Sequence, residues 1–221
     1  MVPLSFAGEE WLLTEGRALY WPSERALLVA DLHLEKGSFF AGHGQMIPPY
    51  DSRETLERVA LAIRETGARR VITLGDNFHD SDGSTRLEPH ACGMLEALTK
   101  AVDWVWITGN HDPHMDARCG GVLVEELELG GVVLRHRAHK GETRPELSGH
   151  YHPRLQLKIR HRNIRRPCAV VSANDGADRK PSGRMILPAF GAYTGGMNAA
   201  DPAILAALQP AERIDAVVPA K

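Results

Sequence analysis

Residues 71–76 read Val71-Ile-Thr-Leu-Gly-Asp76, a short apolar run that ends in a glycine and a carboxylate. The same pattern occurs twice more, where residues 26–30 lead into Asp31-Leu-His33 and residues 104–108 lead into Gly109-Asn-His-Asp112. Such runs predict buried strands, and open α/β sheets bind their ligands at the carboxyl ends of strands. Three strand ends of this kind therefore predict one composite site.

Helical patterns separate the three strands. Asp51-Ser-Arg-Glu54 has the spacing of a capping box, Leu56 begins the apolar stripe of a helix, and Gly67 ends that helix. A second helix is expected over residues 88–100. Strand–helix–strand units imply right-handed parallel crossovers, so the first half is predicted to be βαβαβ. Residues 35–49 contain three Gly and two Pro without a helical period, which predicts a loop over the site.

From about residue 121 the pattern changes to short strands of alternating hydrophobicity. Gly130-Gly131 predicts a hairpin between two of them. Residues 155–159 predict a further half-buried strand, whose exposed face would carry Lys158, Arg160 and Arg162. These cations either follow a phosphate backbone or form an ordinary solvated face. Strands from both halves are expected to form two packed sheets with helices outside.

Composition limits the class of protein. A chain of 221 residues with 43% hydrophobic and 24% charged residues is expected to be one globular domain, residues 1–221. The net charge of −2 does not indicate a nucleic-acid partner, so any basic surface has to be local. Three cysteines without a CxxC pair argue against a disulfide framework and fit a reducing cytosol. No run approaches 18 apolar residues, so we expect a cytoplasmic protein with no membrane partner.

The polar clusters have the chemistry of metal ligands. Asp31-Leu-His33 places two side chains on one face of a strand end, Gly75-Asp76 adds a carboxylate, and Asn110 adds an amide oxygen. His150 and His152 of Gly149-His-Tyr-His152 are likewise expected to share a face and add two imidazoles. A lone Asp-x-His is usually a turn or a surface pair, and Gly-Asp after a strand is common in helix caps and turns. Gly-Asn-His-Asp is rarer than these, and Gly-His-x-His is rarer still. Together they exceed what one tetrahedral ion needs, whereas two ions about 3.5–4 Å apart would use them all. Asp76 is the expected bridge because its strand lies between the other two.

These clusters resemble the binuclear metallophosphoesterases of the calcineurin-like superfamily over roughly residues 26–153. A closer resemblance is to the ligase-associated DNA damage response phosphoesterases called PdeM, and it extends over nearly the whole chain. Four stretches carry it: Leu74-Gly-Asp-Asn-Phe-His-Asp80, Gly149-His-Tyr-His-Pro153, Arg165-Arg-Pro-Cys168 and Leu187-Pro-Ala-Phe-Gly-Ala-Tyr-Thr-Gly-Gly196. The resemblance implies an α/β fold, a four-layer αββα sandwich of two mixed sheets flanked by helices. It also implies a Mn-dependent phosphodiesterase or DNA endonuclease with a role in DNA repair.

The resemblance implies two ligand sets. Those of the first metal would be Asp31, His33, Asp76 and His152. Those of the second would be Asp76, Asn110, a strand-end His and His150. For the strand-end His the candidates are His136 and His139. Strand phase favours His136, because Val132, Leu134 and His136 alternate on one face, but both stay open.

The resemblance also implies catalytic roles. His111 would contact the phosphate or protonate the leaving oxygen. His79 matches a His that lies near the scissile phosphate in the double-strand-break repair nucleases of the superfamily; alternatively it only orders its loop. Asn77, His79 and His111 are therefore the expected substrate-binding residues. The remaining candidates are expected to be loop or surface histidines, namely His43, His90, His114 and His161.

The expected reaction is in-line attack of a metal-bridging hydroxide on a phosphodiester of DNA, single-stranded DNA in the first place. The expected cofactors are two divalent ions, Mn foremost and Fe or Zn as alternatives. The expected functional partners are DNA ligase and other repair enzymes. One alternative is a phosphomonoesterase, or a phosphodiesterase for cyclic nucleotides or nucleotide sugars. The other is a non-catalytic binding module of the same fold.

Overall fold

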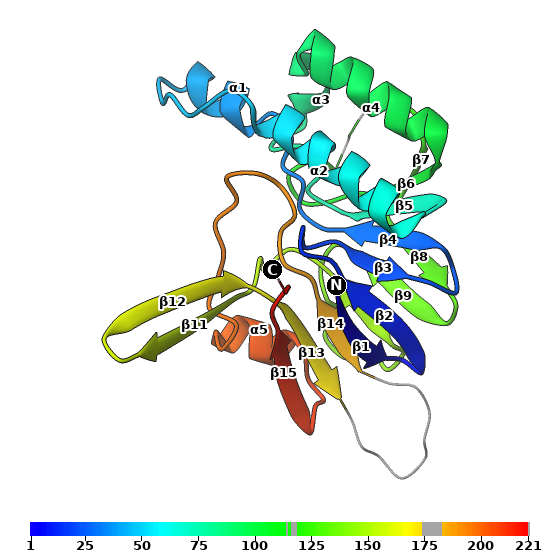
Figure 1. Ribbon diagram of the computed structural model, residues 1–221, viewed down its shortest axis with the longest axis vertical. Helices are drawn as coiled ribbons and strands as arrows, with labels where there is room; N and C mark the ends of the chain where they lie inside the picture. Colours follow the sequence, from blue (N-terminus) through cyan, green and yellow to red (C-terminus); the bar gives the residue numbers. More distant parts are fainter. Residues whose placement is uncertain (114, 116–118, 174–182, 221) are drawn as a thin grey trace.

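Two mixed β-sheets pack together with helices on their outer sides in the computed structural model, which describes residues 1–113, 115, 119–173 and 183–220 (Figure 1). In the described residues the first sheet has seven strands in chain order: β1 (Val2–Phe6), β2 (Glu9–Leu13), β3 (Leu19–Trp21), β4 (Ala26–Val29), β5 (Arg70–Leu74), β6 (Asp103–Ile107) and β7 (Val122–Val124). The second has six, in the order β15 (Arg213–Val217), β13 (Ala169–Ala173), β14 (Arg184–Ile186), β10 (Glu146–Ser148), β9 (Val132–Arg135) and β8 (Glu126–Leu129).

The predicted βαβαβ unit is confirmed. Strands β4, β5 and β6 are parallel neighbours. The two crossovers contain α2 (Asp51–Thr66) and α4 (Pro89–Ala101), which lie on the outer side of the first sheet (Figure 1). Gly67 ends α2 in the left-handed conformation, with φ 66°, as expected for a C-terminal glycine. The antiparallel hairpin of β8 and β9 at Gly130-Gly131 is also confirmed, and both glycines have positive φ.

Apolar side chains fill three layers between four layers of secondary structure. Between the sheets lie Leu28 and Ile72 of the first sheet and Leu134 of the second. Alternate residues of the same central strands, such as Leu27, face α2 and α4 instead, because a parallel strand covered on both sides is apolar throughout. On the far side, α5 (Pro202–Ala207) packs Ile204 against β13 and β14. The predicted αββα sandwich is confirmed.

Residues 35–49 are not the loop that was predicted, because they contain α1 (Lys36–Gly42), and a short helix, α3 (Gly83–Arg86), follows β5. The segment has no helical period of apolar residues, and tertiary contacts stabilise α1 instead. The carboxylate of Asp51 accepts the N–H of Gly37 at 3.1 Å, and Ser52 bonds both the N–H and the carboxylate of Glu35. The predicted capping box was also wrong. Helix α2 starts after Tyr50 with no side-chain cap, and the carboxylate of Asp51 instead accepts a hydrogen bond from α1.

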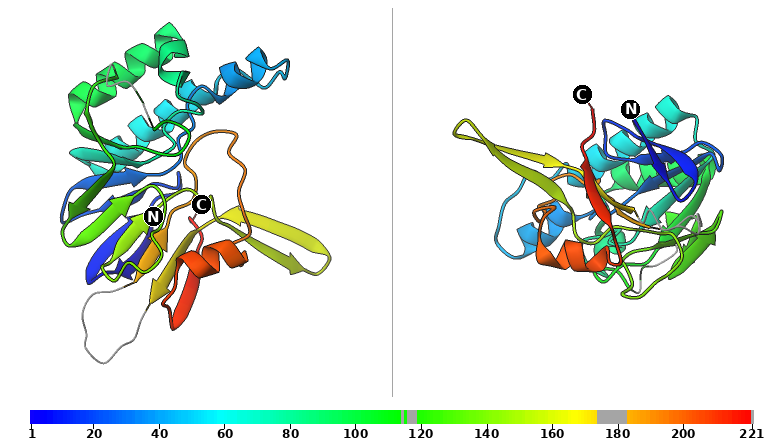
Figure 2. Two further views of the ribbon diagram at one scale, coloured as in Figure 1. Left: turned by 180° about the vertical axis from the view of Figure 1, so that it is seen from behind. Right: turned by 90° about the horizontal axis from the view of Figure 1, so that it is seen from below.

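The strand predicted at 155–159 is one arm of an exposed hairpin. β11 (Arg154–Ile159) forms a two-stranded sheet with β12 (Arg162–Pro167), and an isolated bridge joins Arg154 to Asn198. The hairpin projects from the body on the same side as α1 (Figures 1 and 2). The chain turns at Arg160 and His161, with φ 45° and 65°. Arg162 therefore pairs with Ile159, on the face opposite Lys158, and the prediction that the three cations share one face was wrong.

Among the described helices, none is long and apolar enough to cross a membrane.

Candidate metal centre

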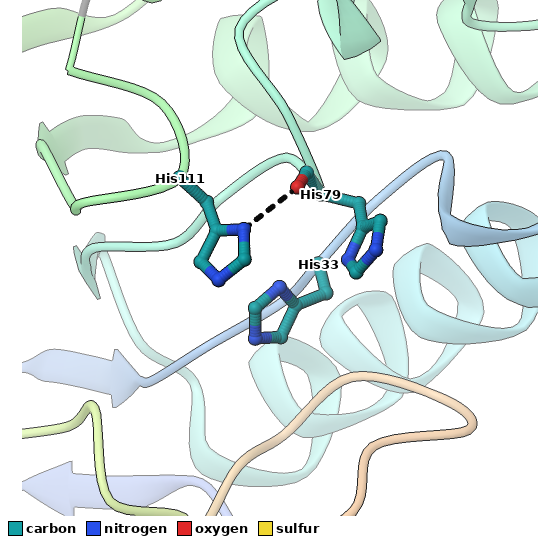
Figure 3. A group of neighbouring side chains, drawn as sticks. All are labelled: His33, His79 and His111. Carbon is teal, nitrogen blue, oxygen red and sulfur yellow. Dashed lines mark hydrogen bonds between the residues drawn. The ribbon is translucent and has the colours of Figure 1, made fainter. Parts of the chain in front are cut away.

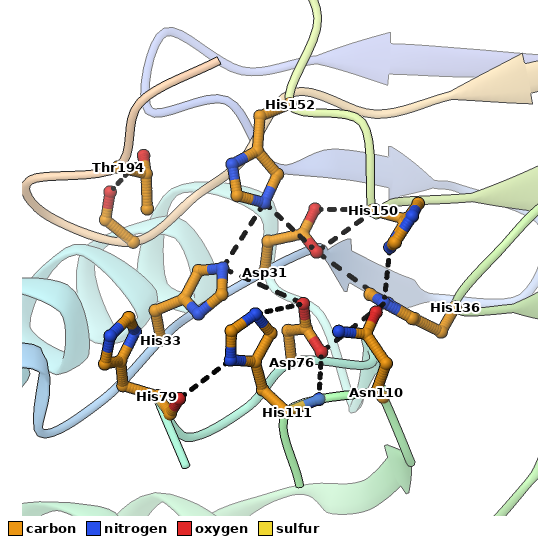
Figure 4. Close-up of polar contacts among 12 residues, drawn as sticks. Asp31, His33, Asp76, His79, Asn110, His111, His136, His150, His152 and Thr194 are labelled. Atoms are coloured by element: carbon orange, nitrogen blue, oxygen red, sulfur yellow. Dashed lines mark hydrogen bonds and ion pairs between the residues drawn. The ribbon is translucent and has the colours of Figure 1, made fainter. Parts of the chain in front are cut away.

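The site lies where the carboxyl ends of strands from both sheets meet. In the first sheet Asp31 lies just beyond β4, Asp76 beyond β5 and Asn110 beyond β6. In the second sheet His136 follows β9 and His150 lies just beyond β10. These side chains point toward one another across the gap between the sheet ends (Figure 4). Parallel neighbours bring their carboxyl ends to one edge, the usual ligand position in α/β sheets.

Asp31, His33 and His152 form the first group of side chains that could hold a metal ion. Nε2 of His152 lies 3.5 Å from Oδ1 of Asp31 and 3.3 Å from Nε2 of His33. Burial, together with the neighbouring imidazoles of His152 and His111, lowers the pKa of His33 to about 2. The His33 ring is therefore neutral at neutral pH and can offer a lone pair to a cation.

Asp76, His136 and His150 form the second group. Nε2 of His136 lies 3.4 Å from Oδ1 of Asp76 and 3.1 Å from Nδ1 of His150. Oδ1 of Asn110 lies 2.9 Å from the same Nε2. On the other edge of the ring, Nδ1 of His136 donates to the carbonyl of Leu74 at 2.9 Å. Burial lowers the pKa of His150 as well, so this ring is also ready to bind as a neutral ligand.

The donor set fits a divalent cation at each group. Because the Leu74 carbonyl can only accept, Nδ1 of His136 carries a proton, and in the neutral ring Nε2 is an acceptor that faces the acceptor oxygen of Asn110. Two such atoms in contact are stabilised by a cation that both coordinate. A backbone carbonyl that fixes the tautomer of an imidazole is typical of metal sites. Carboxylate, amide and imidazole donors without sulfur suit Mn, Fe or Zn.

Asp76 lies between the two groups. Its Oδ1 faces His136 at 3.4 Å and its Oδ2 faces Nε2 of His33 at 3.9 Å (Figure 4). The carboxylate is buried at the end of the central strand β5. One carboxylate with an oxygen toward each group is the arrangement that a ligand bridging two ions requires.

A third group, His33, His79 and His111, lies beside the first (Figure 3). Nδ1 of His111 donates to the carbonyl of His79 at 2.9 Å, which leaves Nε2 directed at Oδ2 of Asp76, 3.9 Å away. The side chain of His111 is 41% exposed and can meet a substrate. Burial and the charges of Lys36 and His111 lower the pKa of His79 to about 4, so this ring is neutral at neutral pH.

The backbone at the site is held in the left-handed region. Asp31, His33, Asp76, His150 and His152 have φ between 45° and 72°, a range in which each non-glycine residue costs about 1–3 kcal/mol. Because His150 and His152 are not in an extended strand, they do not share a face. His150 joins the second group and His152 the first, so the prediction of a shared face was wrong.

The motif glycines allow the chain to pass directly against these side chains. A Cβ atom at position 109 would lie 2.1 Å from the backbone nitrogen of Asp76, and one at position 149 would lie 2.7 Å from Oδ2 of Asp31. Both contacts are shorter than real Cβ atoms tolerate. The N–H of His150, next to the second glycine, donates to both oxygens of Asp31 at 3.1 and 3.0 Å.

Asp112 has a supporting role that the sequence motifs did not indicate. It is fully buried, and it accepts hydrogen bonds from the backbone N–H groups of Asn77 at 2.8 Å, Phe78 at 3.1 Å and Gly109 at 2.9 Å. It therefore joins the segments that follow β5 and β6. The signal available was a carboxylate three residues beyond the glycine that ends a buried strand.

Asn77 and His139, two further predicted residues, make other contacts. Asn77 is fully buried, and its amide donates to the carbonyl of Ile107, the last residue of β6, at 2.9 Å. Its contact with substrate stays a prediction. His139 belongs to none of the three groups among the described residues, and its N–H donates to Glu146. The structure thus brings His136 into the site in place of His139.

Lys36 is a neighbour of the site that was hidden in the expected loop. Its ammonium donates to the carbonyl of Tyr193 at 3.1 Å, and its charge contributes to the lowered pKa of both His33 and His79. The remaining histidines that are described, His43, His90 and His161, are exposed as expected, and His114 lies outside the described residues.

Two comparisons with known proteins place this geometry in context. The profile of the calcineurin-like phosphoesterase family matches residues 24–218. The crystal structure of Pseudomonas putida nuclease MPE is 32% identical in sequence, with a TM-score of 0.68, and the alignment covers 91% of this chain and 92% of that chain. No curated protein sequence matches the chain.

Proposed function

Since the chain belongs to the calcineurin-like phosphoesterase family, whose members use two divalent metal ions, we propose that it is a phosphodiesterase that cleaves DNA. Manganese is the proposed metal, with iron or zinc as alternatives, because the donors are carboxylates, an amide oxygen and imidazoles. The proposed ligands are those of the two groups with Asn110: Asp31, His33, Asp76 and His152 for one ion, and Asp76, Asn110, His136 and His150 for the other.

The observation that carries this proposal is the position of Asp76 relative to its neighbours. One oxygen faces each group, and the exposed imidazole of His111 lies 3.9 Å from the oxygen that faces His33. A bridged pair of cations beside a group that can move a proton is the machinery of phosphoester hydrolysis. A scaffold that only binds a partner would not need it.

Bound cations would polarise a water and the phosphate oxygens and would offset the charge of the transition state. The protein supplies the proton. His111 is held at Nδ1 by the carbonyl of His79, so its Nε2 can take up a proton and deliver it to the departing oxygen. Oδ2 of Asp76 lies on the same side, 3.9 Å from Nε2 of His111. Lys36, beside His79, would offset phosphate charge, and the ring of His79 would lie close to the phosphate.

DNA is proposed as the substrate because the similar protein of known structure is a nuclease and the likeness extends over 91% of this chain. Single-stranded DNA remains the first choice. A place in DNA repair beside a DNA ligase rests on the resemblance of residues 74–80 and 187–196 to the ligase-associated group. A cytoplasmic location rests on cysteine usage and on the absence of an apolar segment in the sequence.

Substrate and metal screens test the proposal directly. The protein is stripped of metal, reloaded separately with Mn, Mg, Fe or Zn, and given a chromogenic phosphodiester, the matching phosphomonoester, a cyclic nucleotide, single-stranded DNA and plasmid. We expect Mn to support turnover of the diester and of single-stranded DNA. Faster turnover of the monoester or the cyclic nucleotide would instead identify a small-molecule phosphoesterase. Failure to bind any metal would identify a binding module.

A further inference from the structure

The β11–β12 hairpin concentrates positive charge in a chain that is acidic as a whole. Residues 154–167 contain six of the 26 Lys and Arg residues and no Asp or Glu. The six are Arg154, Lys158, Arg160, Arg162, Arg165 and Arg166. Among the ion pairs of the described residues, none includes a cation of the hairpin. No carboxylate of the described residues therefore neutralises this charge.

The hairpin is fixed to the site at its base and free at its tip. β11 begins at Arg154, two residues after His152. The guanidinium of Arg154 donates to the carbonyl of Thr194 at 2.8 Å. Arg165 donates to the carbonyl of Gly196 at 2.5 Å. Beyond these anchors the two strands pair with each other and with no other described strand. β11 extends for about 20 Å at roughly 3.3 Å per residue. A nucleic-acid strand held in the metal site could therefore continue along the hairpin.

The two faces of the hairpin differ in chemistry. Residues that pair across the strands share a face, so Lys158 and Asn163 lie on one face. Leu157, Ile159 and Ile164 lie on the other face together with Arg162, which pairs with Ile159. Leu157, Ile159 and Ile164 are 44%, 49% and 37% exposed. Lys and Arg side chains bind the phosphates of a nucleic-acid strand, and the guanidinium of Arg162 beside these apolar side chains can also lie against its bases.

We propose that the β11–β12 hairpin is a nucleic-acid-binding arm that holds the phosphate backbone of the substrate strand away from the scissile phosphate. The proposal rests on the proposed function, because it names how a long substrate is held at the same site. The proposal also explains where the charge lies. Arg154 and Arg165, which are hydrogen-bonded at the base, set the direction of the arm. The cations near the tip would contact the phosphates of the nucleic-acid strand.

The test compares two triple variants of the full-length protein. One replaces the tip cations, Lys158→Ala, Arg160→Ala and Arg162→Ala. The matched control replaces three exposed cations elsewhere, Arg53→Ala, Lys100→Ala and Arg213→Ala, each of which pairs with a carboxylate on its own element. Both remove three charges, so both have the same net charge. Binding of a labelled single-stranded oligonucleotide is measured by fluorescence anisotropy over a salt series with metal-free protein.

We expect the tip variant to bind the oligonucleotide at least tenfold more weakly. The slope of log affinity against log salt should fall in magnitude by about 2, since each phosphate contact to a single strand contributes about 0.7. The control should keep the wild-type affinity and slope. With Mn, the tip variant should lose turnover of long oligonucleotides while it keeps that of a dinucleotide and of a chromogenic diester, which are too short to reach the tip.

Two results would overturn the inference. One is wild-type affinity and salt slope in the tip variant. The other is a dimer in light scattering that Leu157→Ser with Ile164→Ser converts to monomer without a change in DNA binding, because the hairpin would then be a contact between copies of the chain. Failure of the wild-type protein to hydrolyse any diester would instead count against the proposed function, and the binding measurement would still decide the role of the arm.

Discussion

Oδ1 of Asp76 lies 3.4 Å from Nε2 of His136, and this contact joins the end of β5 in the first sheet to the end of β9 in the second. The metal centre is therefore also a junction between the two sheets. Every proposed ligand set contains residues of both sheets, because His152 follows β10 of the second sheet and lies against Asp31, which follows β4 of the first. Loss of ligands should affect metal content, catalysis and stability together.

Replacement of Asp76 by Asn is expected to abolish turnover of a chromogenic phosphodiester with Mn and to lower the metal content. The amide keeps the shape of the side chain but removes the charge that faces both groups. Asp80→Asn is the matched control, because Asp80 pairs with Arg86 and belongs to none of the three groups found among the described residues. Metal content is measured by mass spectrometry of the dialysed protein. Wild-type turnover in the Asp76 variant would exclude the bridging role.

Removal of metal from the wild-type protein is expected to lower the melting temperature. A metal at about 100 times its Kd contributes about 2.7 kcal/mol, which corresponds to roughly 5–10 °C for a chain of this size. The physical reason is that the buried carboxylates of Asp31 and Asp76 would lose the cations that balance their charge. Calorimetry with chelator, and again after Mn is restored, measures the shift. Equal melting temperatures would mean that the metal does not hold the sheets together.

The strands and helices of the first half were predictable because their signals are local. Apolar runs that end at Asp31, Asp76 and Asn110 mark strand ends, and Gly67 marks a helix end. The position of α1 was not predictable, since the residue before it, Glu35, has φ 64° and distant contacts to Ser52 support that conformation.

The identities of the site residues were easier to predict than the directions in which their side chains point. His150 and His152 were expected to share a face, and their left-handed backbone sends them to different groups. The turn at Arg160-His161 was not predicted for the same reason. Left-handed turn positions are normally occupied by Asn or Gly, and here they are occupied by Arg and His. Positive φ at such residues is maintained by tertiary contacts, which a sequence does not display.

His136→Ala is expected to lose metal, whereas His139→Ala should retain it. The ring of His136 lies among Asp76, Asn110 and His150, and its tautomer is fixed by the carbonyl of Leu74. His139 lies three residues on and contributes to none of the three groups. Metal content and Mn-dependent turnover of both variants are compared. Loss of metal in the His139 variant alone would reverse the assignment.

Gly109→Ala is expected to destabilise the protein by about 1–3 kcal/mol, a typical cost of overpacking, and to lower its metal content. The added methyl group would lie 2.1 Å from the nitrogen and 2.3 Å from Oδ1 of Asp76, so the bridging carboxylate has to move. Gly93→Ala in α4 is the control, since a Cβ atom there has no neighbour within 4 Å and should stabilise the helix by about 0.5–1 kcal/mol. Urea denaturation measures both. Equal stabilities would mean that the backbone at Gly109 adjusts freely.

His111→Asn separates proton donation from positioning. An Asn side chain can still donate a hydrogen bond to the carbonyl of His79, as Nδ1 of His111 does, but it cannot protonate a leaving oxygen. We expect full metal content and a loss of about 10²–10⁴-fold in DNA cleavage, the usual contribution of a general acid.

The leaving group gives the sharper readout for the same variant. The alkoxide that leaves a DNA phosphodiester needs a proton, whereas a nitrophenolate leaves readily without one. Turnover of a nitrophenyl diester by His111→Asn should therefore fall much less than cleavage of DNA, while His90→Ala on the surface of α4 should change neither rate. An equal loss with both substrates would show that His111 only positions the phosphate, and a fall in metal content would make it a ligand.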